Sequence, residues 1–272
     1  MRRSYRGLIG SLVLVVSSCA LPRTSGEPHT VRVMSYNIAA GHGDLDRIAA
    51  TIRAEAPEIV ALQEVDVHWH ARSGFADQAA VLAKALGMDA RFAHIYDLDP
   101  TTPGAPRREY GVAILSKHPI VEFHNHTIAR LSTVNEGTPA TPMPGFLEVV
   151  LDVGGTRVRV FDTHIDYRPD PAVRVKQVAE MLAIIGEPSA PTLLFGDLNA
   201  PPIAPELQPL LRRLHDSWPE ANGPGLTYPA TEPVKRIDYV LTSRHFRVQT
   251  MRVPVTEASD HRPVTATLMM YP

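Results

Sequence analysis

The sequence predicts one α/β domain in which strands run in mixed directions. Short apolar runs typical of buried strands alternate with segments of helical periodicity, which excludes an all-α or an all-β fold. Gly154-Gly155 separates two apolar runs and predicts a β-hairpin. No internal repeat with a period of roughly 20–50 residues is present, which excludes a repeat protein. The 272 residues could form one or two domains, but polar groups spread from Asn37 to His261 are expected to converge, which favours one.

The elements follow from periodicity and from residues typical of helix ends. A helix is expected over residues 45–54, with Asp44 as N-cap and the apolar side chains on one face. Further helices are expected at 75–86, closed by Gly87, at 171–185 and near 206–214. The proline-rich segments 100–106 and 138–144 are expected to be exposed loops. Strands are expected at 31–38, 58–65, 91–96, 110–116, 120–129, 146–153, 156–161, 192–195, 236–242, 246–253 and 263–270.

The N-terminus predicts export from the cytoplasm. Residues 1–6 are basic, residues 8–16 are apolar, and small residues precede Cys19, so residues 1–18 are expected to be a signal peptide. Val16-Ser-Ser-Cys19 resembles the bacterial lipobox, in which the cysteine is lipidated after cleavage; a plain signal peptide cut near Ala20 is the alternative. A linker over 19–29 and a main domain over 30–272 follow. The expected location is the bacterial cell envelope, lipid-anchored at Cys19, or the secreted fraction.

The charge balance argues against tight, nonspecific nucleic-acid binding. Loss of residues 1–18 removes Arg2, Arg3 and Arg6 and lowers the formal net charge from −2 to −5. No long run of lysine or arginine compensates for this acidic balance. Because Cys19 is the single cysteine, no disulfide is expected, and the hydrophobic core must hold the domain together.

Acidic, amide and imidazole side chains recur where apolar runs end. Rigid strands that open into loops are suited to positioning functional groups. Carboxylates and amides suit a hard divalent cation, whereas histidines suit proton transfer and oxyanion stabilisation. The sequence therefore predicts a metal-dependent hydrolase. The residues concerned are Asn37, Glu64, His164, Asp197, Asn199, Asp238, Asp260 and His261.

Seven segments, in order, resemble the endonuclease/exonuclease/phosphatase superfamily. They are Ser35-Tyr-Asn-Ile38, Leu62-Gln-Glu-Val65, Tyr110-Gly-Val-Ala-Ile-Leu-Ser-Lys117, Thr163-His-Ile-Asp166, Gly196-Asp-Leu-Asn199, Ile237-Asp-Tyr239 and Ser259-Asp-His261. A lone Gly-Asp-x-Asn is a common turn sequence, but the ordered set covers nearly the whole chain after the N-terminal segment. The resemblance, to the deoxyribonuclease I-like and sphingomyelinase-like members, implies a four-layer sandwich of two packed mixed β-sheets flanked by helices. It also implies a Mg²⁺-dependent or Mn²⁺-dependent phosphoesterase.

The resemblance also implies a role for each polar residue. Asn37, Glu64 and Asp260 are expected to hold the metal. Asp238 is expected to orient His261, and His164 to donate to the phosphate or the leaving oxygen. The two histidines share the role of base and acid, without a choice between them. Asp197 is expected to position the attacking water and Asn199 to donate to the pentavalent phosphorus centre.

The chain departs from its relatives at two positions. Val112 stands where many carry asparagine, and Pro142-Met-Pro-Gly145 stands where many carry a phosphate-binding arginine. Arg130, Arg107 or Arg108 could replace that arginine. Of lower rank, Asp66, Asp166, Arg72 and Gln78 could support the site or simply belong to local structure.

The expected function is hydrolysis of a phosphodiester outside the cytoplasm, by in-line attack of water. The substrate is a phospholipid or its head group, or a nucleic acid; the residues do not decide between them. The alternative class is a non-catalytic binding lipoprotein that keeps the fold. Relatives that have lost activity usually lack the metal glutamate or a histidine, and both are present here. A monomer is expected.

Overall fold

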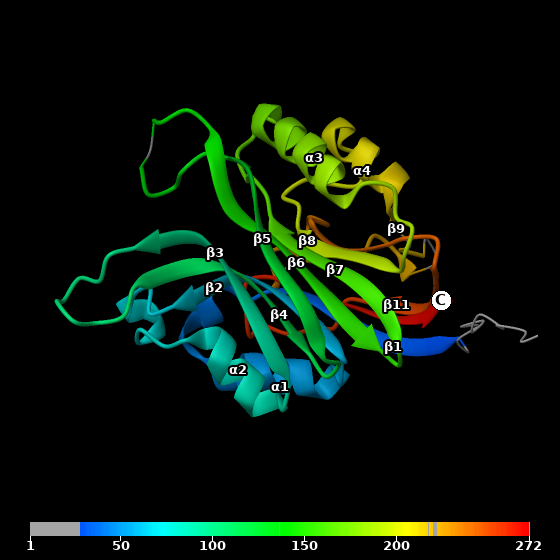
Figure 1. Ribbon diagram of the computed structural model, residues 1–272, viewed down its shortest axis with the longest axis horizontal. Coiled ribbons are helices and arrows are strands. Elements are labelled where there is room, and N and C mark those ends of the chain that lie inside the picture. The colour runs from blue at the N-terminus through cyan, green and yellow to red at the C-terminus, as the bar shows by residue number, and fades with distance from the viewer. Residues whose placement is uncertain (1–27, 136, 217, 220–221, 272) are drawn as a thin grey trace, which may run out of the picture.

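Two six-stranded sheets form the centre of the computed structural model, which describes residues 28–135, 137–216, 218–219 and 222–271. The first sheet has the order β11-β12-β1-β2-β4-β3 and the second the order β5-β6-β7-β8-β10-β9. Figure 1 shows α1 and α2 outside the first sheet and α3 and α4 outside the second. The expected four-layer α/β sandwich is thereby confirmed. The signal-peptide and lipobox predictions fall on residues 1–27, outside the described residues.

The elements alternate along the chain as strands, helices and short 3₁₀ helices. The α-helices are α1 (Leu45–Glu55), α2 (Gln78–Leu86), α3 (Ala172–Ile185) and α4 (Gln208–Arg213), and the 3₁₀ helices are η1 (Ala39–Gly43), η2 (Ala71–Ser73) and η3 (Pro205–Leu207). The strands are β1 (His29–Asn37), β2 (Ile59–Val67), β3 (Asp89–Leu98), β4 (Arg108–Ser116), β5 (Ile120–Arg130), β6 (Thr141–Val153), β7 (Thr156–His164), β8 (Thr192–Asp197), β9 (His215–Asp216), β10 (Asp238–Thr242), β11 (Phe246–Arg252) and β12 (Val264–Met270). None of the described helices is long and apolar enough to cross a membrane.

Local chemistry sets most of the element ends where the sequence predicted them. The Asp44 side chain accepts a hydrogen bond from the Arg47 N–H at 3.0 Å and starts α1, which ends at Ala56 in left-handed conformation. Gly154 and Gly155 both have positive φ, at +59° and +86°, and join β6 to β7 as the predicted hairpin.

Several expected boundaries differ from the structure by two or three residues, β9 was not expected, and two differences have a clear local cause. α2 begins at Gln78 rather than near Phe75, because Asp77 caps it by accepting from the Ala80 N–H at 2.9 Å. The segment expected to be a loop over 138–144 enters β6 from Thr141 onward. Only β5 pairs with this first part of β6, since β7 joins from Leu147, so prolines are tolerated there.

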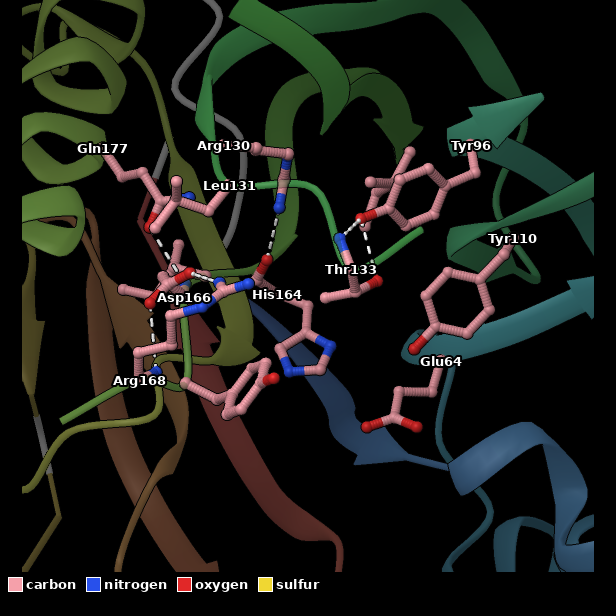
Figure 2. Close-up of a pocket in the computed structure, with 13 residues that line it drawn as sticks. Glu64, Tyr96, Tyr110, Arg130, Leu131, Thr133, His164, Asp166, Arg168 and Gln177 are labelled. Atoms are coloured by element: carbon pink, nitrogen blue, oxygen red, sulfur yellow. Dashed lines mark hydrogen bonds and ion pairs between the residues drawn. The ribbon is translucent and has the colours of Figure 1, made fainter. Parts of the chain in front are cut away.

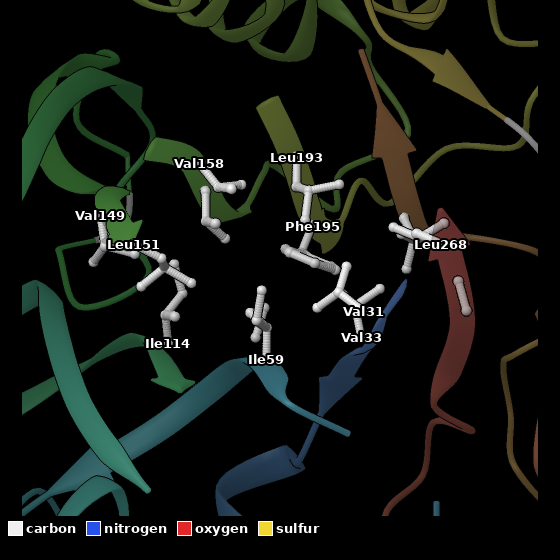
Figure 3. Close-up of a cluster of buried hydrophobic side chains, with 14 of the residues drawn as sticks. Val31, Val33, Ile59, Ile114, Val149, Leu151, Val158, Leu193, Phe195 and Leu268 are labelled. Atoms are coloured by element: carbon white, nitrogen blue, oxygen red, sulfur yellow. The ribbon is translucent and has the colours of Figure 1, made fainter. Parts of the chain in front are cut away.

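The core has three apolar clusters, one in each of the three interfaces between the four layers. The largest lies between the sheets and includes Val31, Ile59, Leu151, Leu193 and Phe195 (Figure 3). The two others bury the apolar helix faces against the outer sides of the sheets. Burial of this kind stabilises the fold by about 25 cal/mol per Å² of apolar surface. The sandwich is therefore a rigid support for the loops at its ends.

Candidate active site

Strand direction brings the polar residues to one end of the sandwich. β1 runs parallel to β2, and β7 runs parallel to β8, so the carboxyl ends of each pair lie together. β10 is antiparallel to β8 and places Asp238 opposite Asp197. β12 is antiparallel to β1, with Val264 opposite Ser35, so the loop before β12 lies at the same end. Residues far apart in the chain thus converge because of sheet topology.

Asn37, at the end of β1, joins the two sheets. Its side-chain oxygen accepts from the Ala39 N–H at 3.0 Å, which sets the direction of its amide nitrogen. That nitrogen donates to Glu64 Oε1 and to Asp197 Oδ2, both at 3.1 Å. Asn37 is fully buried, so its position is well defined.

Glu64 lies at an irregular position in β2. Its φ is +56°, a left-handed conformation that costs a non-glycine residue free energy, and the pairing of β2 with β4 shifts register between Leu62 and Val65. The irregularity lies at the residue whose side chain accepts a hydrogen bond from Asn37. Strain of this kind clusters at functional sites, which supports a functional role for Glu64.

Asp197, at the end of β8, is the centre of the polar cluster. Besides Asn37, its Oδ2 faces His164 Nε2 at 3.5 Å and His261 Nε2 at 3.7 Å. Its Oδ1 accepts from the Asn199 N–H at 2.9 Å. Asn199 has a positive φ of 49°, and its side chain donates to the Ile165 carbonyl at 3.1 Å. These contacts hold the loop after β8 against the end of β7.

The expected contact between Asp238 and His261 is present. Asp238 Oδ2 lies 2.9 Å from His261 Nδ1, and both side chains are buried. The Tyr228 ring packs against the imidazole, with centroids 4.7 Å apart. Asp238 fixes one ring nitrogen, so Nε2 is directed at Asp197.

Asp260 joins the cluster through its loop. Ser259 donates to the Asn37 carbonyl at 2.8 Å and lies 3.3 Å from Asp260 Oδ1. The Asp260 carbonyl accepts from the Ala230 N–H at 2.6 Å. Its negative charge contributes to raising the pKa of His261. All eight predicted residues therefore lie at one end of the sandwich, six of them linked side chain to side chain and Asn199 and Asp260 attached through their loops.

The surroundings of Asp197 and His261 raise the pKa values of both groups. Burial raises the pKa of Asp197 to about 6, and the charge of Asp238 adds to the increase, while both histidines oppose it. Burial lowers the pKa of His261, but the charge and hydrogen bond of Asp238, with Asp197 and Asp260, outweigh this and raise it to about 10. At neutral pH the cluster thus pairs a cationic imidazole with an aspartate near its titration range.

Two oxygen-rich positions could hold a cation. Ligand atoms of Asp197, Asp238 and His261 all lie within 4.8 Å of one another. A histidine must be neutral to bind a metal, however, and His261 is held as a cation by Asp238. The position formed by Glu64, with Asp260 on the adjoining loop and the Asn37 amide beside it, offers carboxylate oxygens and fits Mg²⁺ or Mn²⁺ better.

Sequence reasoning missed two aromatic residues of the site. Burial raises the pKa of Tyr110 well above its ordinary value, and the charge and hydrogen bond of Glu64 add to this. Tyr110 begins one of the matched segments, so its place was visible, although its contact with Glu64 was not. Tyr228 lies in a loop, and no pattern there indicated its packing against His261.

Of the three arginines considered as replacements for the phosphate-binding arginine, Arg130 lies beside the cluster and the other two do not. Arg107 pairs with Asp97 and Asp99, and Arg108 lies over the Trp69 ring, so neither faces the cluster. Arg130 lies beside His164 and donates to its carbonyl at 2.6 Å. Glu64, Tyr110, Arg130 and His164 all line one pocket of about 190 Å³ (Figure 2).

Comparisons agree with this geometry. The model of the endonuclease/exonuclease/phosphatase family matches residues 34–261, which span every residue of the cluster. The chain belongs to this family. A search of curated proteins finds no match.

Solved structures of this family share the fold. An endonuclease/exonuclease/phosphatase from Beutenbergia cavernae is 26% identical, with a TM-score of 0.69, 89% of this chain covered and 72% of that one. A mannosyl-6-phosphatase from Bacteroides thetaiotaomicron is 20% identical, with a TM-score of 0.63 and coverage of 88% and 99%. The human Nocturnin catalytic domain is 19% identical, with a TM-score of 0.65 and coverage of 89% and 94%. The last two show the fold alone.

Proposed function

We propose that the protein is a divalent-metal-dependent phosphoesterase that hydrolyses a phosphodiester by in-line attack of water. The observation that carries the proposal is the linked cluster at one end of the sandwich, in which Asp197 contacts Asn37, His164 and His261. The family to which the chain belongs comprises nucleases and phosphatases, which all cleave phosphoric esters.

Each side chain has a role that follows from its protonation and contacts. Asp197 is ionised above its pKa of about 6 and can accept a proton from the attacking water. His261, held cationic by Asp238, donates to a phosphoryl oxygen or to the leaving group. His164 faces the same space across Asp197.

The metal is expected at the opposite side of the cluster. Glu64, Asn37 and Asp260 would hold it, and a bound divalent cation polarises the phosphoryl oxygens. Asn37 connects the two sides, because its amide nitrogen donates to both Glu64 and Asp197. Glu64 lies on the metal side of this connection, so a change at Glu64 tests metal binding first.

Between the two substrate classes, exposed apolar side chains support a phospholipid. Loops next to catalytic residues carry Tyr167, Ile203 and Val234, which are 61%, 87% and 70% exposed. Apolar side chains at this end of the molecule suit contact with a lipid surface better than with a polyanion. Parallel assays with phospholipid vesicles and plasmid DNA test the choice. Cleavage of DNA alone would contradict the lipid proposal.

The proposed activity is tested with bis(4-nitrophenyl) phosphate. Hydrolysis should require Mg²⁺ or Mn²⁺, stop with EDTA and return when the metal is restored. His261→Ala should lower kcat roughly 10²–10⁴-fold, because the proton-transfer contribution is lost. His124→Ala, which removes an exposed imidazole on β5, is the matched control and should keep full activity. Metal-independent hydrolysis, or a fully active His261→Ala variant, would contradict the mechanism.

A further inference from the structure

The pocket beside His164 extends away from the catalytic cluster. Residues from both sheets and their loops line it, among them Tyr96, Tyr110, Arg130, Asp166 and Arg168 (Figure 2). The proposed catalytic residues that it reaches are Glu64 and His164, at one side. A substrate with its scissile phosphate at the cluster would therefore place its next group in this pocket.

Arg130 is a buried cation without an acidic partner among the residues that the structure describes. Its guanidinium donates to the carbonyls of Pro144, His164 and Gly145 at 3.0, 2.6 and 2.8 Å. The residue is 6% exposed, and burial lowers its pKa to about 10. Backbone carbonyls satisfy some of its five N–H groups but do not neutralise its charge. An uncompensated buried cation next to a pocket favours an anionic ligand.

The charge of Asp166 acts favourably on Arg130, but Asp166 is already paired with Arg168. Arg168 and Asp166 form an ion pair at 2.5 Å, and Gln177 Oε1 accepts from the Asp166 N–H at 2.9 Å. Arg168 also lies over the Tyr167 ring, 5.1 Å from its centroid. If Glu64 is assigned to the metal, the pocket has two arginines and one aspartate. Its net charge is therefore positive.

Arg130 and the imidazole of His164 lie on opposite sides of the His164 backbone. Figure 2 shows Arg130 next to the carbonyl, while the imidazole points away from it and toward Glu64. Arg130 thus faces a different space from the side chains that would surround the scissile phosphate. An anion at Arg130 would be a second anionic group of the substrate.

We propose that this pocket is a second anion subsite, in which Arg130 and Arg168 bind an acidic group that the substrate carries next to its scissile phosphate. The proposal rests on the phosphoesterase function proposed above. The ligand chemistry is an oxyanion, either a carboxylate or a second phosphoryl group. The Tyr96 and Tyr110 rings, whose centroids are 6.2 Å apart, form one wall of the pocket and favour an aromatic spacer between the two anionic groups. Thr133 holds that wall in place by donating its N–H to the Tyr96 hydroxyl at 2.7 Å.

Three inert ligands test the subsite without turnover. Phenylphosphonate has one anionic group, whereas 4-carboxyphenylphosphonate and 1,4-phenylenebisphosphonate add a carboxylate or a phosphonate. Calorimetric titration of the Mg²⁺-loaded protein should show at least one of the two latter ligands binding about tenfold more tightly than phenylphosphonate, as charge-assisted hydrogen bonds to a partly buried arginine imply. The stronger of the two identifies the source of the oxyanion.

Substitutions then show which arginine produces the preference for a second anion. Arg130→Gln should remove the preference for a second anion, and Arg168→Gln, at a more exposed position, should reduce it even if Arg130→Gln does not fold. Arg72→Gln is the matched control, because Arg72 forms the equivalent ion pair with Asp66 but does not line the pocket. It should keep the preference.

Three outcomes would overturn the subsite. They are equal affinity of the unaltered protein for all three ligands, a full preference in Arg168→Gln, or an equal loss in Arg72→Gln. Failure of the proposed function would look different, since hydrolysis of bis(4-nitrophenyl) phosphate would be absent while the binding preference persisted.

Discussion

The backbone just after Glu64 in β2 and just after His164 at the end of β7 is supported in the same way, although the two strands lie in different sheets. Two residues after Glu64, the Asp66 N–H donates to Gln78 Oε1 of α2 at 2.9 Å. Two residues after His164, the Asp166 N–H donates to a glutamine of α3, also at 2.9 Å. In each half a helix outside the sheet thus holds the backbone two residues after a proposed functional side chain, within β2 in one half and in the loop after β7 in the other.

The aspartates of the two regions also bind arginine alike. Asp66 pairs with Arg72 at 2.9 Å, and Asp166 pairs with Arg168 at 2.5 Å. Each arginine lies near a tyrosine ring, Tyr110 in one half and Tyr167 in the other. The two regions differ at the residue two positions before the aspartate, which is the carboxylate Glu64 in one half and the imidazole His164 in the other. The same scaffold therefore positions the proposed metal ligand on one side and the proposed proton donor on the other.

The largest expected effects are on Mg²⁺ affinity and on kcat, and they test whether Glu64 binds the metal while His164 donates a proton. Glu64→Gln removes the charge that holds a hard cation, so Mg²⁺ affinity and hydrolysis should fall together. His164→Gln should keep Mg²⁺ affinity and lose roughly 10²–10⁴-fold in kcat. Calorimetric Mg²⁺ titration beside rates at saturating metal measures both. Unchanged Mg²⁺ binding in Glu64→Gln would show that the two halves do not divide the roles in this way.

A smaller effect concerns the supporting glutamines. Gln78→Leu and Gln177→Leu each leave a buried backbone N–H without its acceptor, which should cost about 1–3 kcal/mol of unfolding free energy. The loss should be greater for Gln78, because it also donates to the Ala40 carbonyl at 2.6 Å. Denaturant unfolding measures both, with Gln249→Leu on an exposed part of β11 as the control. Losses no larger than in the control would show that the glutamines do not support the loops.

The smallest expected effect is on the pH dependence of stability, and it concerns Gln63 and Asp162, which are in contact between the two sheets. Gln63 of β2 donates to Asp162 Oδ1 of β7 at 2.7 Å, and burial raises the pKa of Asp162 well above its ordinary value. Above a pH of about 4, where an unfolded aspartate ionises, the folded state therefore retains more protons than the unfolded state. The stabilisation that protonated Asp162 contributes is full below a pH of about 4, and it is lost as the pH rises from there toward the raised pKa of the folded state.

Asp162→Asn should remove this pH dependence. The amide keeps an acceptor for Gln63 and adds a donor near Gln63 Oε1, which is buried without a partner among the described residues. We expect a gain in unfolding free energy on the order of 1 kcal/mol at about pH 8, and little change at about pH 4. Thermal unfolding at both pH values measures it. A loss of stability at the higher pH would show that Asp162 is ionised and useful in the folded protein.

Most strands and the polar residues at their ends were predictable because they depend on near neighbours in the chain. Alternation over 31–37 predicts a strand, and Asp44 predicts the start of α1, since a capping side chain acts within one turn. The start of α2 was misplaced because the cap at Asp77 competes with periodicity that extends back to Phe75. β6 was predicted too short because prolines usually mark loops, and only the pairing with β5 makes them acceptable.

Local patterns were enough to predict the α/β class, the family resemblance and the eight polar residues, because each is expressed in short stretches of chain. How those residues act on one another depends on the packing of the two sheets. Asn37 and Asp197 are 160 residues apart in the chain, and their contact exists because both sheets end at the same place. The burial of Arg130 without an ion-pair partner in the described part of the chain and the cationic state of His261 likewise depend on neighbours brought in from other strands. Burial and electrostatic fields are properties of the packed molecule, so no local pattern could have predicted them.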